Sequence, residues 1–226
     1  IKFIYSCGSM YKVCNENLMF HGCIPMDENG NFLSLKIGKE EVSGKALLDA
    51  CNDMACRSYY SKRNTSERKN ANDFMWYLWC GSKSPLYGKN KMAFFEKYFI
   101  DDTSLIKEVY NPYFRLYDNH EIFMRIFDEF GISRKKGHII NGHVPVKIKD
   151  GESPVKADGK VFVIDGGISK AYQSKTGIAG YTLIYNSRHY RIVSHQPFTS
   201  KWNAVHKNDD IRNDSEIFEK METRMR

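Results

Sequence analysis

The sequence contains no long apolar run. No stretch approaches the ~20 consecutive apolar residues that a membrane-spanning helix requires. The first residues, "IKFIYSCGSMYK", have neither the apolar core of a signal peptide nor an initiator methionine. We therefore expect a cytoplasmic protein with no membrane partner, and we expect the given sequence to begin partway through a longer protein.

The sequence also lacks any Cys-x-x-Cys pair, which argues against a zinc ribbon and a thioredoxin-type redox motif. Its six cysteines all lie in the first 80 residues, at positions 7, 14, 23, 51, 56 and 80. A disulfide framework is the less favoured interpretation for a chain of 226 residues. Buried or unreactive thiols in a reducing cytosol account for the same pattern.

The composition is typical of a globular protein with excess positive charge. With 42% hydrophobic and 14% aromatic residues, the chain can bury the core of one large domain or two small ones. Its formal net charge of +7 favours anionic partners, which include nucleic acid, an acidic membrane surface and phosphorylated metabolites. Composition alone does not choose among these three.

Hydrophobic periodicity predicts an α/β protein. Apolar and alternating runs predict strands at 17–20 and 31–38, and the runs "HIING", "KVFVID", "YTLIYN" and "YRIVSH" predict four more. Turn residues in "KADGK" and "NSRH" indicate that these four strands form consecutive hairpins in one sheet. The charged tail that begins at Lys201 is expected to be a helix or a loose segment.

Helical spacing of apolar residues predicts helices at 43–62, 91–99 and 119–131, with Ser43 as an N-cap and Gly131 as a C-terminal stop. The polar segment 63–73 separates the helix at 43–62 from the next apolar run. The aromatic segment "NDFMWYLWC" favours a buried helix face over the alternative, the wall of a pocket.

Two histidines follow predicted strands, in "NLMFHGCIPM" and "HIINGHVPVK". A single histidine at a strand end, such as His21, usually satisfies a nearby backbone carbonyl. The second occurrence, at His143, favours a shared function over this structural explanation, because each histidine precedes a proline-containing turn. Strand ends hold imidazoles rigidly while the turns admit a ligand, so the pair suits metal ligation.

The sequence segments around these histidines are a more specific signal than the histidines themselves. The segments "LMFHGCIPMDENGNF", "WYLWCGSKSPLYGKNKMAFFEKYF" and "HIINGHVPVKIKDGESPVKADGKVFVIDGGISKAYQSKTGIAGYTLIYNS" resemble the class III fructose-1,6-bisphosphatases of Firmicutes. That family belongs to the calcineurin-like metallophosphoesterases. The resemblance implies the C-terminal part of an αββα sandwich, a mixed sheet with flanking helices, and a dinuclear Mn²⁺ site. It assigns His21 of a His-Gly motif and His143 of a Gly-His motif to the same ion.

The remaining ligand motifs of the superfamily are missing. The sequence contains no Asp-x-His, no Gly-Asp-x-x-Asp-Arg and no Gly-Asn-His-[Asp/Glu], and Pro145 replaces the last histidine of Gly-His-x-His. The resemblance therefore implies that residues 1–200 are the C-terminal portion of the catalytic domain, with a helical insertion at about 43–130 and a charged tail at 201–226. The missing N-terminal portion of the same enzyme would supply the other ligands and the general acid, so no catalytic residue is assigned here.

Phosphate groups need fixed cationic or backbone donors. The candidates lie in "GSKSPLYGK", after His143, and in "DGGISKAY", and they are Lys83, Lys89, Lys147, Gly166, Gly167, Ser169, Lys170 and Tyr172. Each lysine could instead be ordinary solvated surface. The Asp-Gly pair could equally be a plain hairpin turn, although a glycine turn between a strand and a helix can present backbone N–H groups to a phosphate.

The resemblance implies that the full-length protein hydrolyses the 1-phosphate of fructose 1,6-bisphosphate to fructose 6-phosphate in gluconeogenesis. Activity of this chain alone stays open, as does assembly as a homo-oligomer. One alternative is a non-catalytic regulatory or assembly portion. The other is a basic binding module, which the absence of Lys and Arg between Lys69 and Lys83 disfavours for nucleic acid.

Overall fold

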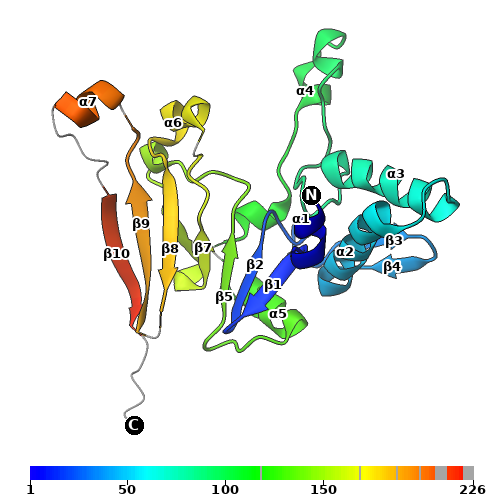
Figure 1. The fold of residues 1–226 in the computed structure, drawn as a ribbon, viewed down its shortest axis with the longest axis horizontal. Helices are drawn as coiled ribbons and strands as arrows, with labels where there is room; N and C mark the ends of the chain where they lie inside the picture. Colours follow the sequence, from blue (N-terminus) through cyan, green and yellow to red (C-terminus); the bar gives the residue numbers. More distant parts are fainter. Residues whose placement is uncertain (118, 168, 187, 199, 207–212, 221–226) are drawn as a thin grey trace. The chain divides into compact units, whose positions relative to one another are not determined.

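A computed structural model describes residues 1–226 of the chain apart from positions 118, 168, 187, 199, 207–212 and 221–226 (Figure 1). The chain divides into two compact units, Ile1–Gly137 and His138–Arg226. Both contain helices and strands, so the architecture is α/β. The division expected at residue 200 falls inside the second unit. Within the described ranges, no helix is both long and apolar enough to cross a bilayer.

The first unit combines two β-hairpins with helices. Strands β1 (Tyr11–Cys14) and β2 (Asn17–Phe20) pair antiparallel across Asn15 and Glu16, both with positive φ, as two-residue hairpin turns require. The second hairpin consists of β3 (Leu35–Ile37) and β4 (Glu40–Val42). The helices and helical turns are α1 (Lys2–Cys7), α2 (Gly44–Tyr60), α3 (Ser66–Cys80), η1 (Glu96–Tyr98), α4 (Thr103–Ile106), η2 (Pro112–Arg115) and α5 (His120–Phe130).

Helix α5 confirms the expected helix at 119–131. Asn119 caps it by accepting a hydrogen bond from the Ile122 N–H, and Gly131 ends it in the left-handed conformation at φ 66°. Its apolar face is buried through Ile122, Phe123, Met124, Ile126, Phe127 and Phe130. Burial of this face, rather than intrinsic propensity, stabilises the helix.

Helices α2 and α3 pack together around buried Leu47, Cys51 and Leu78. The expected helix at 43–62 is confirmed, and Ser43 occupies its N-cap position without a side-chain capping bond. Helix α3 begins at Ser66, within the polar segment 63–73. Thr65 caps it by accepting from the Arg68 N–H, and Glu67 lies in its first turn, where a negative charge is favoured.

The aromatic segment 72–80 is amphipathic rather than buried throughout. Leu78 is buried, and Phe74 and Met75 pack against the core. Trp76 and Trp79, in contrast, are 65% and 57% exposed and contact each other edge to face. The expected core face is therefore present, with the two tryptophans on the outside of the helix.

The second unit contains two sheets. In the first, β5 (His138–Asn141) pairs parallel with β7 (Val161–Val163), which pairs antiparallel with β6 (Val155–Lys156), so this sheet is mixed. The second is antiparallel and contains β8 (Gly180–Tyr185), β9 (His189–His195) and β10 (Asn213–Lys220). The remaining elements are η3 (Ile148–Asp150), η4 (Ala157–Gly159), α6 (Lys170–Thr176) and α7 (Lys201–His206).

The expectation of consecutive hairpins in one sheet is wrong. Only the "NSRH" turn joins antiparallel neighbours among the four expected strands, because β5 and β7 are parallel and a parallel pair needs a crossover. Aromatic rings connect the two sheets: Phe162 stacks on Tyr190 at 5.4 Å between centroids, and His138 lies 4.5 Å from Tyr190. His138 is buried and belongs to this core. The tail expected from residue 201 contains α7 and β10.

Candidate metal and phosphate site

His21 follows β2 directly, as the sequence predicted, and its side chain is exposed. The next residue, Gly22, lies against another loop: a Cβ at Gly22 would stand 2.3 Å from the Pro85 carbonyl oxygen. The Cys23 N–H donates to that same carbonyl at 3.0 Å. The glycine of the His-Gly pair is therefore required for the close packing that fixes the turn at the end of β2.

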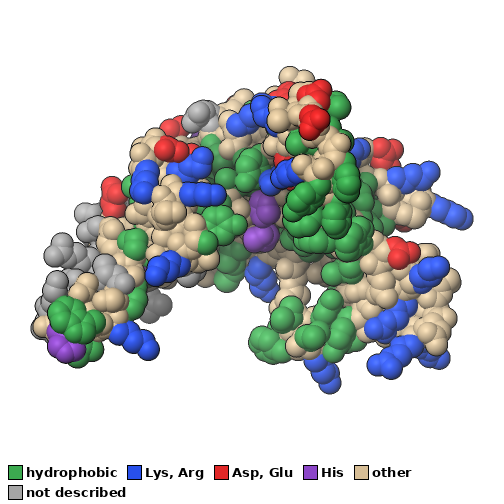
Figure 2. Space-filling view, turned by 90° about the horizontal axis from the view of Figure 1, so that it is seen from above, with side chains coloured by type: hydrophobic (Ala, Val, Ile, Leu, Met, Phe, Trp, Pro, Cys, Tyr) green, Lys and Arg blue, Asp and Glu red, His purple; other side chains and the backbone are tan. Residues whose placement is uncertain are grey.

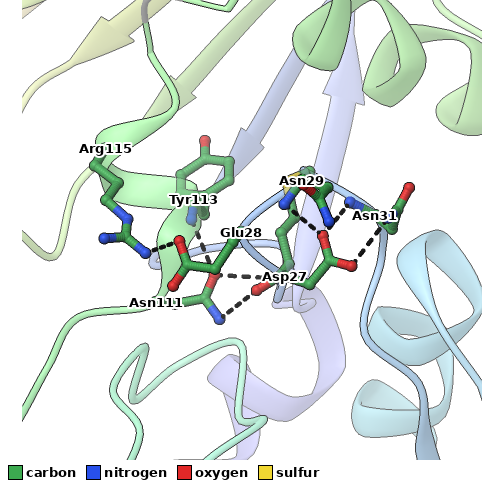
Figure 3. A network of polar contacts seen from close by, with 8 residues as sticks. Asp27, Glu28, Asn29, Asn31, Asn111, Tyr113 and Arg115 are labelled. Carbon is green, nitrogen blue, oxygen red and sulfur yellow. Dashed lines mark hydrogen bonds and ion pairs between the residues drawn. The ribbon is translucent and has the colours of Figure 1, made fainter.

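A polar network fastens the chain that follows this turn (Figure 3). The Asn111 side chain accepts from the Met26 N–H at 3.1 Å and donates to the Met26 carbonyl at 3.2 Å. Asp27 accepts from the backbone N–H groups of Asn29 and Asn31, both at 2.9 Å. The Asn31 side chain donates to Asp27 as well, which lowers the pKa of that carboxyl. Sequence reasoning found the Asn-Gly turn here but missed Asn111, which is distant in sequence.

His143 follows β5 in a strained turn. Its φ is +72°, which is uncommon outside glycine, and the Val144 N–H donates to the Gly142 carbonyl at 2.9 Å. A hydrogen bond that skips one residue at positive φ defines a γ-turn of the rare, strained kind. Such strain costs about 1–3 kcal/mol and concentrates at functional sites. The half-buried imidazole is thus placed by a backbone conformation that packing must maintain.

The two histidines lie in different units, so each position is described by itself. Across the part of the chain that the structure describes, no group of three or more His, Cys, Asp or Glu side chains could hold a metal ion. Each of the two imidazoles, taken by itself, is a ligand type that suits a borderline divalent ion.

The loops after β5 and β7 lie side by side. The Ile164 N–H donates to the Asn141 carbonyl at 3.0 Å, and the Val146 N–H donates to the Asp165 carbonyl at 2.8 Å. His143 lies on the first loop and the glycine pair on the second. Both loops leave the carboxyl ends of parallel strands, where α/β proteins commonly bind ligands. The structure therefore brings together the second histidine motif and the predicted phosphate loop.

Close packing explains Gly166, and a left-handed backbone explains Gly167, in the "VIDGG" segment. A Cβ at Gly166 would lie 2.5 Å from the Gly180 Cα, and Gly167 has a φ of +69°. The Gly167 N–H donates to the Asp165 carboxylate at 2.9 Å. The expected strand, glycine loop and helix are confirmed as β7, the loop and α6, while the role of the two glycines in phosphate binding stays a prediction.

Three predicted phosphate contacts lie around the first turn of α6. Ser169 occupies its N-cap, Lys170 begins the helix, and Tyr172 is 52% exposed. The Tyr172 N–H donates to the Ser169 carbonyl at 2.9 Å. All three side chains are exposed and follow the glycine loop in the sequence, and their contact with a phosphate stays a prediction.

Lys83 and Lys147 differ in their surroundings. Lys83 lies in the first unit, and its ammonium donates to the Ser34 carbonyl at 2.6 Å, a structural contact that uses one of its three donors. Lys147 is exposed in the second unit, and its ammonium lies 3.7 Å from the Asp150 carboxylate. Its backbone N–H donates to Glu152 at 3.0 Å, a partner that sequence reasoning missed. Lys147 adjoins the β5 loop and is the better placed of the two.

These features define an α/β protein with a histidine at each of two strand ends and a glycine loop beside the second. The chain belongs to the family described as Firmicute fructose-1,6-bisphosphatase, which matches residues 1–226.

Curated relatives agree with this family. The chain is 53% identical over 226 residues to the protein named fructose-1,6-bisphosphatase class 3 of Clostridium tetani, 48% identical to that of Clostridium botulinum strain Langeland, and 50% identical to a class 3 protein of Clostridium beijerinckii. Each match covers 100% of this chain and 34% of the relative, so the chain spans about a third of their length. No solved structure matches it.

Proposed function

We propose that this chain is part of a fructose-1,6-bisphosphatase that removes the 1-phosphate of fructose 1,6-bisphosphate. The products are fructose 6-phosphate and inorganic phosphate, as gluconeogenesis requires. One observation carries the proposal: the family match extends over every residue of the chain. We further propose that the complete enzyme has the αββα fold of the metallophosphoesterases and acts in the cytoplasm.

His21 and His143 are the proposed metal ligands of this chain, in a dinuclear Mn²⁺ site. Their support is local: a tightly packed His-Gly turn after β2 and a strained γ-turn after β5. An N-terminal portion of the same enzyme would supply the other ligands, because the relatives are about three times as long. When bound, the metal ions would polarise the phosphoryl oxygens and activate the attacking water.

The second unit would bind the phosphate group itself. Lys147 and Lys170 offer positive charge, and Ser169 and Tyr172 offer hydroxyl donors around the loops after β5 and β7. These donors neutralise charge on the phosphoryl oxygens as the oxygen of water bonds to phosphorus. The bond between phosphorus and the C1 oxygen breaks, and fructose 6-phosphate leaves with a proton on that oxygen. Lys83 would contribute through the donors of its ammonium that the Ser34 carbonyl does not use.

The ligand assignment is tested by the metal content of the intact encoded protein after incubation with Mn²⁺ and gel filtration. The wild type should retain about two ions per chain, as two-metal hydrolases do. His21→Ala and His143→Ala should each lose bound metal. The matched control is His120→Ala, because His120 is exposed at the start of α5 and belongs to neither turn. Unchanged metal content in both ligand variants would refute the assignment.

A further inference from the structure

Residues 89–110 form a long loop of the first unit whose two ends are bridged to each other. We call this loop the aromatic arm. Lys89 and Tyr110 make an antiparallel bridge at its base. The Asn90 N–H donates to the Val109 carbonyl at 2.9 Å, and the Val109 N–H donates back to the Asn90 side chain at 2.8 Å. The helix expected at 91–99 is wrong, since only the turn η1 forms there.

Glu108 organises the interior of the aromatic arm. Its carboxylate accepts from the Lys89 ammonium at 2.7 Å and from the Ala93 N–H at 3.0 Å, and the Lys97 ammonium lies 3.8 Å away. The Lys89 ammonium also lies 5.1 Å from the centroid of the Tyr110 ring. The arm is therefore a structure with its own internal contacts, which fix how it presents its outer side chains.

Those outer side chains are large and apolar. Phe94, Phe95, Tyr98, Phe99 and Leu105 are 64%, 70%, 78%, 84% and 60% exposed. Hydrophobic side chains gather in exposed clusters on the face seen in Figure 2. Four rings of this size expose about 600 Å², at the upper end of what monomers leave uncovered. A stable interface buries about 800 Å² per partner, so a partner that covered the arm would gain most of that area here.

The charge of the arm favours a second copy over an anionic partner. Its four lysines balance its four acidic residues, Lys89, Lys91, Lys97 and Lys107 against Glu96, Asp101, Asp102 and Glu108, while the whole chain carries +7. A neutral patch gives no attraction to nucleic acid or to an acidic membrane. It also gives no repulsion between two identical surfaces, which in a twofold dimer must be self-complementary.

We propose that the aromatic arms of two copies of this chain pack against each other in a twofold contact. The buried centre of the contact is formed by Phe95 and Phe99, which are among the most exposed rings of the arm. The contact is independent of the proposed phosphatase activity, because the arm contains neither proposed metal ligand and its one phosphate candidate, Lys89, is paired with Glu108.

Sedimentation equilibrium of the intact encoded protein tests the contact. The wild type should be a dimer at micromolar concentration. Phe95→Ser combined with Phe99→Ser should raise the dimer dissociation constant by about 100-fold or more, since buried aromatic anchors dominate interfaces. The matched control is Trp76→Ser with Trp79→Ser, which removes a comparable exposed aromatic pair from α3. It should leave the dimer intact.

Three outcomes overturn the proposal. A wild type that stays monomeric, with a melting temperature that falls in the arm variant, shows that another part of the same chain covers the arm. Arm-dependent binding of a monomeric wild type to vesicles of phosphatidylcholine and phosphatidylserine identifies a membrane as the occupant. An arm variant that dimerises as strongly as the wild type places the interface elsewhere.

Discussion

At the scale of single residues, the most informative feature is the backbone at His143. A β-strand that ends in a γ-turn at φ +72° carries strain that glycine would avoid, yet the chain has an imidazole there. Selection for stability alone would place glycine, and not histidine, at this position. The strain therefore supports a functional role for His143, in agreement with its place beside the glycine loop.

His143→Gly should be more stable than His143→Ala by about 1 kcal/mol, because both lose the imidazole but only glycine relieves the left-handed backbone. Urea unfolding of the two variants measures the difference. Equal stabilities would mean that the turn at His143 is not strained. Both variants should lose metal, so stability and metal binding are separated in one pair of proteins.

Cysteine reactivity is a second prediction at this scale. The six cysteines are free, with Cys7 and Cys14 exposed and Cys23 and Cys51 buried. Burial raises the pKa of Cys51 to about 12 and raises that of Cys23 as well, so both remain protonated at pH 8. Iodoacetamide should label the two exposed thiols at least ~100-fold faster, because only the thiolate reacts. In urea all six should react alike; fast labelling of Cys51 in the folded protein would contradict its burial.

At the scale of elements, Glu108 provides a pH-dependent contribution to the aromatic arm. The hydrogen bond from Lys89 lowers the pKa of Glu108 below its ordinary value. A lowered folded-state pKa stabilises the protein above the unfolded pKa of about 4.3, and the contribution is lost as the pH falls through the folded value.

Glu108→Gln should therefore lower the free energy of unfolding by about 1 kcal/mol at pH 7, with a difference that shrinks toward zero at acid pH. Thermal unfolding of both proteins at pH 7 and near pH 3 measures this. Glu96→Gln is the control, because Glu96 lies in the same arm and is exposed. A difference that persists undiminished at acid pH would show that the carboxylate charge is not responsible.

Elements with one apolar face were predictable from the sequence. Helix α5 has caps at both ends and a buried stripe, and the strand runs of both units stand out for the same reason. The helix predicted at 91–99 was wrong, because the crowded aromatic residues of this segment resemble a buried helix face although they are exposed in the arm. Strand order was also unpredictable: the parallel pairing of β5 with β7 depends on tertiary contacts that no local pattern encodes.

The candidate site was predictable only in part for the same reason. Sequence motifs located His143 and the glycine pair, but only the β5–β7 pairing brings their loops together. Asn111, which anchors the segment after His21, carries no local signal because its partner Met26 is 85 residues away. Long-range polar contacts of this kind are invisible to periodicity and turn chemistry.

At the scale of the whole molecule, the chain spans about one third of the length of its class 3 relatives. Its 226 residues match the family throughout, yet they cover 34% of the class 3 protein of Clostridium tetani. Two imidazoles cannot hold two metal ions by themselves, so a dinuclear site needs ligands from outside this sequence. The proposed activity therefore belongs to the complete enzyme, to which we propose that this chain contributes two metal ligands and the phosphate loops.

The most direct test is release of inorganic phosphate from fructose 1,6-bisphosphate by the intact encoded protein, measured with and without Mn²⁺. We predict metal-dependent turnover in the wild type and in His120→Ala, and a loss of at least ~100-fold in His143→Ala, because removal of a metal ligand costs more than the 10- to 100-fold of an outer-shell change. Turnover in His143→Ala equal to that of the wild type would contradict the account.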